Sequence, residues 1–340
     1  MGRESHTTKH KSLAALILGV AVFACAGRAS PQEKLRLGLS SVSALHSAVW
    51  VAEEKGLFRK HGLEPEIIVV GGAGPMGVSA LLAGDIQFVT SAGDAVVNAN
   101  LRGGDAVMVA GVINSGLQRL VARPEIKNPG DIKGKKIGVT RIGAVSHAAL
   151  QIVLRRWGFA DGDVQVIQVG SSPNMLASLE KGGIDGAVLT LPSIFVAEDR
   201  GYRVLADLAD LDIYYLHAMM ATTRAYIRAQ RDKARRFLMG YLEGIAYFKQ
   251  HKQESIEIVK KKLRTGPAQE GNLARAYDLL AAKYYETKPY PSLKGVESVL
   301  GFAEKENPRA KGADPKSFVD DSLLKEIDAS GFVKTLYESK

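Results

Sequence analysis

The sequence predicts an α/β protein of two similar lobes, because one short piece of sequence occurs twice in it. The first copy, LLAGDIQFV, covers residues 81–89, and the second, LEKGGIDGAVL, covers residues 179–189. Each copy is typical of a helix that ends at glycine, followed by an acidic residue and a short apolar strand. A cleft between two such lobes is where a small molecule would be held.

Strands and helices alternate regularly before residue 228. The expected strands, with helices between most of them, cover residues 35–39, 64–70, 86–90, 107–112, 136–140, 164–169, 186–189 and 214–221. This alternation predicts mostly parallel sheets with helices on both faces. From residue 228 onward, apolar residues recur at spacings of three and four, which predicts helices. We expect these terminal helices to pack on the first lobe.

The restart of the pattern indicates that the chain passes between the lobes twice. We expect the crossings near residues 121–125 and 218–223. Residues 31–122 and 223–340 would then form lobe 1, and residues 123–222 lobe 2. Two crossings form a hinge, on which the lobes can close.

Residues 1–30 have the pattern of a secretory signal. Arg3, Lys9 and Lys11 precede an apolar stretch at residues 13–23. That stretch is shorter than the roughly 20 apolar residues that a membrane-spanning helix needs, and it fits a signal peptide. We therefore expect a periplasmic or otherwise extracytoplasmic protein.

Cys25, the only cysteine, leaves the end of this signal open to two interpretations. Small neighbouring residues suit cleavage after Ala26 or after Ala29. Residues 22–25 also resemble a bacterial lipobox, in which the cysteine is lipidated, although Phe23 is atypical there. With either interpretation, the folded part contains no cysteine and therefore neither a disulfide nor thiol chemistry.

The positive charge of the chain does not indicate a nucleic-acid partner. The formal net charge is +9, and residues 1–30 supply +3 of it. The one dense basic run of the remainder, residues 260–262, lies in a helical, charge-mixed region. Such a run is typical of a solvated helix face.

Four stretches of the chain resemble the substrate-binding proteins of nitrate, sulfonate and taurine ABC importers, a family that also includes thiamine-pyrimidine relatives. They are AEEKGLFRKHGLEPEI, LLAGDIQFV, DIKGKKIGV and LEKGGIDGAVL, in this order. The resemblance implies a periplasmic-binding-protein fold of the second type, which closes on a solute for delivery to an ABC permease and its ATPase. We expect a monomer that touches the membrane only through a lipid, if Cys25 is lipidated.

A glycine-rich turn follows the second expected strand. Gly72, Gly74 and Gly77 match the G-x-G-x-x-G pattern of dinucleotide-binding sites. The position after a second strand and the export signal both disfavour a nicotinamide cofactor. We favour a turn that offers backbone amides to an anionic or polar ligand, and a purely structural turn is the alternative.

Polar residues follow several expected strands at their carboxyl ends, where open α/β sheets bind ligands. Ser146 and Asp94 have a structural alternative, because both are also placed to be helix N-caps. Arg141 is the one candidate cation, and it would pair with a carboxylate, sulfonate or phosphate if it faces the cleft. The candidate ligand-binding residues are Ser40, Ser41, His46, Gly72, Gly74, Ser91, Ala92, Thr140, Arg141, Ser146 and Thr190.

The sequence lacks the common catalytic patterns, with no G-x-S-x-G elbow and no H-E-x-x-H motif. The histidines at positions 46, 61, 147, 217 and 251 are scattered rather than spaced for a metal, so we expect them at the surface or at helix ends. We therefore predict neither a metal site nor a cofactor.

An enzyme is the main alternative to a binding protein, because thiamine-pyrimidine synthases share this fold. Those enzymes are intracellular and carry a cysteine-rich motif that this chain lacks. A menaquinone-pathway-like enzyme is opposed by the signal, and a solute sensor is a third alternative. We expect a small anionic or polar solute, and nitrate, sulfonates, pyrimidines and organic acids all stay open.

Overall fold

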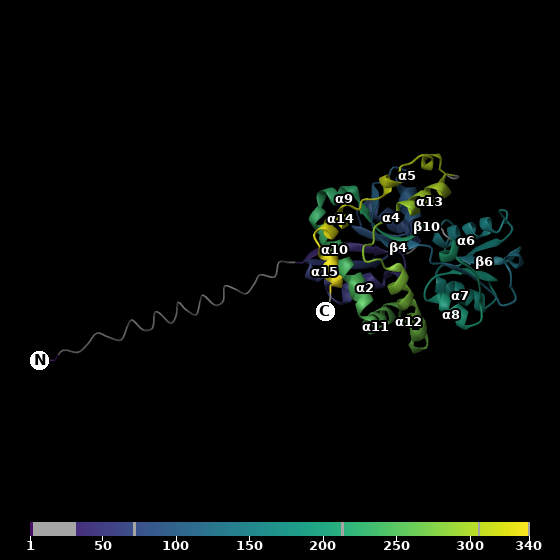
Figure 1. The fold of residues 1–340 in the computed structure, drawn as a ribbon, viewed down its shortest axis with the longest axis horizontal. Coiled ribbons are helices and arrows are strands. Elements are labelled where there is room, and N and C mark those ends of the chain that lie inside the picture. The colour runs from purple at the N-terminus through teal and green to yellow at the C-terminus, as the bar shows by residue number, and fades with distance from the viewer. Residues whose placement is uncertain (3–31, 71–72, 212–213, 305–306, 339–340) are drawn as a thin grey trace.

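The computed structural model has two lobes joined side by side (Figure 1). No helix among the residues it describes is long and apolar enough to cross a membrane. The expected signal peptide, with the sites around Cys25, lies outside the described residues apart from its first two. The described residues are 1–2, 32–70, 73–211, 214–304 and 307–338.

Each lobe is built on a five-stranded sheet, which confirms the predicted two-lobed α/β fold. The first sheet has the order β2-β1-β3-β10-β4, with β1 Glu33–Leu39, β2 Leu63–Val69, β3 Phe88–Ser91, β4 Ala106–Ser115 and β10 Tyr214–Thr223. The second has the order β7-β6-β8-β5-β9, with β5 Arg119–Ala122, β6 Lys136–Val139, β7 Gln165–Gln168, β8 Gly186–Leu189 and β9 Arg203–Asp207. The two sheets therefore share one topology.

One strand in each sheet runs against the others, so the sheets are mixed. β10 is antiparallel to β3 and β4, and β5 is antiparallel to β8 and β9. The other pairings, of β1 with β2 and β3 and of β6 with β7 and β8, are parallel. β10 and β5 are the strands that enter a lobe from the other lobe. Each of them starts at the edge of its sheet where the parallel strands have their carboxyl ends. It must therefore run antiparallel to those strands.

The chain crosses between the lobes earlier than the sequence predicted. Residues 119–122, assigned to lobe 1, form β5 in the second sheet, and residues 214–222, assigned to lobe 2, belong to β10 in the first. The crossings therefore follow β4 and β9. The sequence predicted the strand at residues 214–221 but not the sheet that it joins, because that choice depends on pairing with strands distant in sequence. Residues 119–122 were not predicted as a strand.

The repeated piece of sequence folds into equivalent elements of the two lobes. In lobe 1, α4 (Ala73–Ala83) ends at Gly84, with φ +84°, and leads into β3. In lobe 2, α7 (Ser172–Glu180) is followed by Gly182, with φ +78°, and leads into β8. Glycine suits both turns because other residues rarely adopt positive φ.

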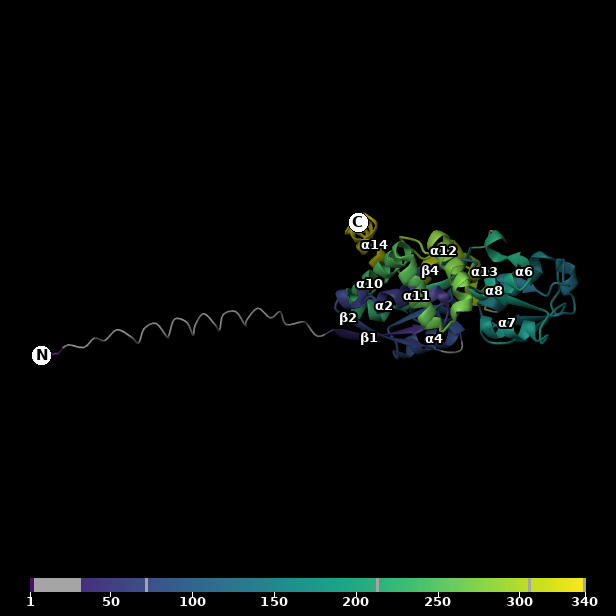
Figure 2. The ribbon, with the colours of Figure 1, turned by 90° about the horizontal axis from the view of Figure 1, so that it is seen from below.

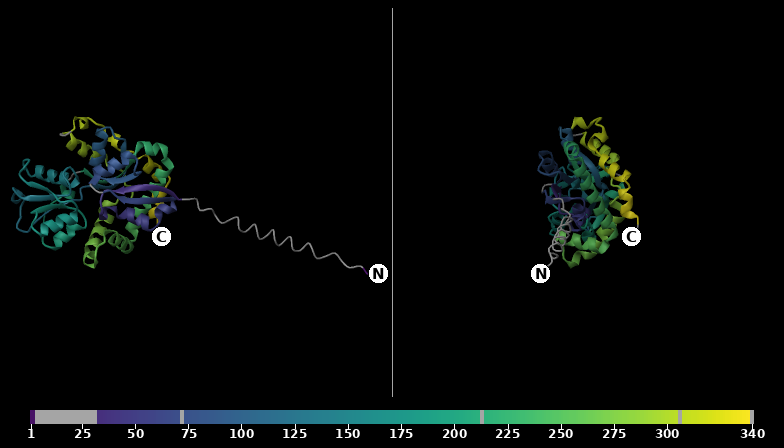
Figure 3. Two further views of the ribbon diagram at one scale, coloured as in Figure 1. Left: turned by 180° about the vertical axis from the view of Figure 1, so that it is seen from behind. Right: turned by 90° about the vertical axis from the view of Figure 1, so that its left-hand side faces the viewer.

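Helices cover both sheets, and the C-terminal helices lie mainly on lobe 1 (Figure 3). Lobe 1 also contains α2 Ser47–Glu54, α3 Leu57–Lys60 and α5 Gly93–Leu101, and lobe 2 contains α6 Val145–Arg156 and α8 Ser193–Asp199. The C-terminal helices are α9 Arg224–Ala229, α10 Arg231–Gln250, α11 Lys252–Leu263, α12 Glu270–Leu279, α13 Leu293–Ala303, α14 Ser322–Ala329 and α15 Phe332–Tyr337.

The C-terminal helices also contact lobe 2, α12 through α8 (Figure 2) and α13 through Arg155 of α6, whose guanidinium lies 5.1 Å from the centroid of the Phe302 ring. Arg275 Nη2 lies 2.8 Å from Glu198 Oε2, and Arg275 Nη1 lies 2.7 Å from Asp199 Oδ1. The same guanidinium lies 4.2 Å from the centroid of the Phe195 ring. The lobes are therefore in contact beside the hinge as well as joined through it.

Close packing of α10 on α2 and α3 depends on two glycines that the sequence analysis did not single out. A Cβ at Gly240 would lie 2.6 Å from a ring carbon of Phe58. A Cβ at Gly244 would overlap the carbonyl oxygen of Ala48 and lie 2.8 Å from the Cβ of Ala52. Any larger residue at Gly244 therefore has to move a backbone.

We expect Gly244→Ala to lower the free energy of unfolding by about 1–3 kcal/mol, because overpacking forces a backbone shift. Guanidinium unfolding followed by circular dichroism measures this. Gly301→Ala in α13 is the control, since nothing lies within 4 Å of its added Cβ. It should leave stability unchanged or raise it by up to about 1 kcal/mol. Equal effects of the two substitutions would contradict the packing argument.

Candidate ligand-binding cleft

A cavity of about 990 Å³ lies between the lobes and is lined by residues from both. The lining includes the loop after β1, the start of α5, and the segments that follow β6 and β8. These are the carboxyl ends of strands, as expected for an α/β sheet. Nine predicted ligand-binding residues belong to the lining: Ser40, Ser41, His46, Gly74, Ala92, Thr140, Arg141, Ser146 and Thr190. Their role in binding stays a prediction.

Of the two other predicted residues, Ser91 is not among those that line the cavity. Gly72 lies outside the described residues. Ser91 is buried, and its hydroxyl donates a hydrogen bond to the carbonyl oxygen of Ala92 at 3.3 Å. Packing also explains Gly74, because a Cβ there would lie 2.6 Å from Ser91 Oγ. Close packing of α4 on β3 therefore supports the structural alternative for this glycine.

An acidic side chain, Asp94, lies in the lobe 1 wall of the cavity. The N-cap of α5 is Ala92, and Asp94 stands in the first turn, where its Oδ1 accepts a hydrogen bond from Ala95 N at 2.8 Å. Burial raises the pKa of Asp94 to about 6. The carboxyl group is therefore mostly charged at pH 7, and the lobe 1 wall is not uniformly suited to anions.

Paired hydroxyls fix the strand ends in the lobe 2 wall. Ser146 Oγ accepts a hydrogen bond from Thr140 N at 2.8 Å and lies 2.7 Å from Thr140 Oγ1. Ser172 Oγ accepts from Thr190 N at 3.2 Å and lies 3.2 Å from Thr190 Oγ1. Ser146 is thus not an N-cap, a position that Ala144 occupies in α6. Ser172 was missed because its partner, Thr190, is distant in sequence.

Arg141 and a second arginine bring positive charge to the lobe 2 wall. Arg141 is exposed in the loop after β6 and lines the cavity. Arg200, at the end of α8, also lines it and forms an ion pair with Glu180. The sequence analysis missed this pair, because both residues read as ordinary surface positions of helices.

Three polar side chains in the lining are buried and contain at least one atom that has no hydrogen-bond partner in the described chain. They are His46, Gln118 and His217, with 2%, 1% and 7% of their surface exposed. The unpartnered atoms are both ring nitrogens of His46, Oε1 of Gln118 and Nδ1 of His217. Burial lowers the pKa of each histidine to about 4, so both imidazoles are neutral at pH 7.

The position of His217 corrects the expectation that the histidines lie at the surface or at helix ends. His217 is part of β10, and Gln118 directly precedes β5. Both were missed because the crossings were predicted several residues too late. The sequence pattern of apolar and polar residues does not show where the chain crosses between lobes. Only the strand pairing in the structure shows that Gln118 and His217 lie next to the crossings.

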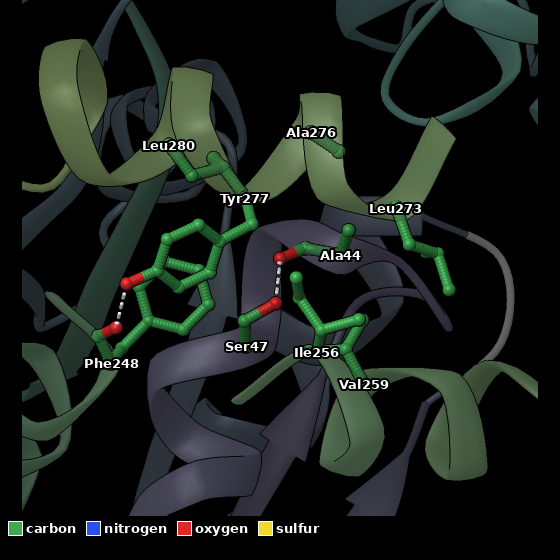
Figure 4. Close-up of a pocket in the computed structure, with 9 residues that line it drawn as sticks. All are labelled: Ala44, Ser47, Phe248, Ile256, Val259, Leu273, Ala276, Tyr277 and Leu280. Carbon is green, nitrogen blue, oxygen red and sulfur yellow. Dashed lines mark hydrogen bonds between the residues drawn. The ribbon is translucent and has the colours of Figure 1, made fainter. Parts of the chain in front are cut away.

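A second, much smaller pocket lies among α2, α11 and α12 (Figure 4). Its volume is about 10 Å³, which holds at most one water molecule. Tyr277 closes one side of it by donating a hydrogen bond to the carbonyl oxygen of Phe248 at 2.7 Å. This pocket is a packing gap behind the cleft wall and not a solute site. Within the described ranges, no group of three His, Cys, Asp or Glu residues could hold a metal ion.

Two α/β lobes, two chain crossings and a polar cleft at the carboxyl ends of the strands define the periplasmic-binding-protein fold of the second type. The chain belongs to the NMT1/THI5-like family, whose model matches residues 43–255.

Its relatives by sequence include binding proteins. A Brucella abortus protein described as a binding protein is 31% identical over 226 residues, or 64% of this chain and 68% of the relative. The taurine-binding periplasmic protein of Escherichia coli is 30% identical over 132 residues, or 38% of this chain and 40% of the relative. A Haemophilus influenzae protein described as a thiamine biosynthesis protein is 29% identical over 161 residues, or 46% and 50%.

Solved structures show the same fold at lower sequence identity. The periplasmic aliphatic sulphonate-binding protein of Escherichia coli matches with a TM-score of 0.68 and 22% identity, over 86% of this chain and 92% of the other. The periplasmic nitrate-binding protein of Synechocystis PCC 6803 matches with a TM-score of 0.71 and 14% identity, over 90% and 91%.

We expect the protein to be less stable at pH 5 than at pH 7, by roughly 1–3 kcal/mol. The pKa of each buried imidazole is about 4 instead of 6.5, so the unfolded chain binds more protons in this window and acid favours unfolding. Asp94 opposes this, because its pKa is raised from 3.8 to about 6. Guanidinium unfolding at both pH values measures the difference.

Two variants check the sign of each contribution. His217→Leu should reduce the loss of stability between pH 7 and pH 5, because one titrating imidazole is removed. Asp94→Asn should enlarge the loss, because it removes the group that acts the other way. If His217→Leu loses as much stability between pH 7 and pH 5 as the wild type does, the His217 imidazole is not a source of the pH dependence.

Proposed function

We propose that this protein is an extracytoplasmic receptor that captures a small anionic or polar organic solute and delivers it to an ABC importer. The observation that carries the proposal is the cleft lining, in which hydroxyl, amide and charged groups of both lobes gather at the ends of the strands. A solute that contacts both lobes favours the closed arrangement, and the permease would recognise that closed form.

The names of the relatives support the solute class and the location. The taurine-binding and aliphatic sulphonate-binding proteins are both periplasmic. We therefore propose sulfonate-like, nitrate-like or pyrimidine-like solutes, a periplasmic or otherwise extracytoplasmic monomer, and no reaction catalysed by the chain itself. Residues 1–30 would direct export, with a lipid on Cys25 as the alternative to its removal.

Arg141 is the residue that we propose for the anionic part of the solute. It lies in the loop after β6, and its side chain is exposed at the cavity. Guanidinium groups hold carboxylates and sulfonates through charge-assisted hydrogen bonds. Asp94 in the opposite wall would repel an anion that approached lobe 1 while its carboxyl group is charged, which favours binding of the charged end to lobe 2.

A thermal-shift screen tests whether the protein binds such a solute. The purified protein is heated with sulfonates, nitrate, carboxylates, amino acids and pyrimidines in turn. A ligand at about a hundred times its dissociation constant adds roughly 2.7 kcal/mol, which raises Tm by several degrees. We expect one chemical class to produce such a shift. If no class of compound raises Tm, the result supports the alternatives of a solute sensor or an enzyme.

We expect Arg141→Ala to weaken binding of an anionic solute by about 1.5–3 kcal/mol, the usual contribution of a charge-assisted hydrogen bond. Isothermal titration calorimetry measures the change. Arg228→Ala is the control, because Arg228 is exposed on α9 and is not among the residues that line the cavity. Unchanged affinity of Arg141→Ala would remove Arg141 from the site.

A further inference from the structure

Both chain crossings place a buried polar side chain in the cleft lining. Gln118 ends the first crossing, and His217 follows the second. His46, from the turn Ala44–His46 after β1, joins them in the same lining. We call His46, Gln118 and His217 the hinge group.

The hinge group is buried at a cost that the fold itself does not offset. A buried polar atom that has no hydrogen-bond partner destabilises the folded protein. For this reason, nearly all buried polar atoms in native structures have a partner. The ring of His46 lies edge-on to the ring of Trp50, with ring centroids 6.2 Å apart. His46 nevertheless has no hydrogen-bond partner for either ring nitrogen among the described residues. The three residues line the cavity, but these unpartnered atoms have almost no exposed surface, so a bound solute would supply their partners once the side chains turn toward it.

The hydrogen-bonding capacity of the hinge group determines which kind of solute group it can bind. Because burial lowers the pKa of both histidines to about 4, each imidazole is neutral at pH 7. A neutral imidazole has one donor nitrogen and one acceptor nitrogen, and the Gln118 amide likewise offers both. The group therefore complements a neutral polar group better than a bare oxyanion. The charged residues of the lining are Asp94, Arg141, Glu180 and Arg200.

We propose that the hinge group binds an uncharged hydrogen-bonding group of the solute, such as a hydroxyl or an amide, while Arg141 holds the anionic end. This inference rests on the proposed function. It narrows the substrate class to small anions that carry a second, neutral polar group, and it disfavours nitrate. Because Gln118 ends one crossing and His217 lies in the strand that follows the other, binding at this group also couples the solute to the hinge.

Matched pairs of anions test the proposal by calorimetry. Ethanesulfonate is compared with 2-hydroxyethanesulfonate, and benzoate with 4-hydroxybenzoate, so that each pair differs by one hydroxyl. We expect the wild-type protein to bind the hydroxylated member of at least one pair about tenfold more tightly, the effect of one well-placed hydrogen bond. Gln118→Met and His217→Leu should lose this preference.

The free energy of unfolding, measured without any anion, distinguishes a role of the hinge group in binding from a role in stabilising the fold. Removing an unpartnered buried polar atom should leave Gln118→Met and His217→Leu at least as stable as the wild type at pH 7. Tyr241→Phe is the matched control. Its hydroxyl is also buried without a partner, but it lies in α10 and is not in the cavity lining. We expect Tyr241→Phe to keep the preference for the hydroxylated anion.

The possible results separate the two proposals. Loss of the hydroxyl preference in the hinge-group variants, with Tyr241→Phe unchanged, supports the hinge group as a binding subsite. Binding of the anions with no hydroxyl preference in the wild type, or with the same preference in all variants, overturns the subsite but leaves the proposed receptor function intact. Failure of all four anions to bind counts against the receptor function for these classes and removes the subsite with it.

Discussion

Pairing between the two chain crossings is the constraint on which the cleft depends. β4 leaves lobe 1 and β10 enters it, and the two strands pair side by side. Beyond them, Leu208 N donates a hydrogen bond to the carbonyl oxygen of Gln118 at 3.0 Å, and a Cβ at Gly116 would lie 2.8 Å from that of Leu208. The lobes are thus joined by two strands in contact and not by two independent linkers. These contacts restrain the two crossings relative to each other, and the strand ends of both lobes face one cavity.

Two parts of the cleft lining differ in whether the protein itself supplies partners for their buried polar groups. In the lobe 2 wall, hydroxyls pair with one another, and the strand ends are held without a ligand. At the hinge, His46, Gln118 and His217 are equally well buried but keep unpartnered atoms. Sequences that specify one fold usually satisfy such groups, and exceptions are expected where a protein binds something. The hinge group is such an exception, in the part of the molecule that must respond to a solute.

More of the fold than of the site could be predicted from the sequence. The repeated helix-glycine-strand units predicted two lobes, and the positions after the expected strands pointed to Thr140, Arg141 and Thr190, which line the cavity. What failed was the placement of two segments: residues 119–122 were not predicted as a strand, and the predicted strand at residues 214–221 was assigned to the wrong lobe. Strand pairing over long distances leaves no local pattern. The same error hid Gln118 and His217. Ser172 and the Arg200–Glu180 ion pair escaped for a related reason, since their roles depend on contacts between segments.

The contact between α12 and α8 makes the two flanks of the cleft unequal. Thr265 and Gln269 lie just before α12, Val196 belongs to α8, and all three line the cavity. At this flank the lobes can separate only if the Arg275 guanidinium leaves both carboxylates and the Phe195 ring. Dissolved salt screens such exposed ion pairs, so it would ease the opening of the lobes without any change in the residues that line the cavity.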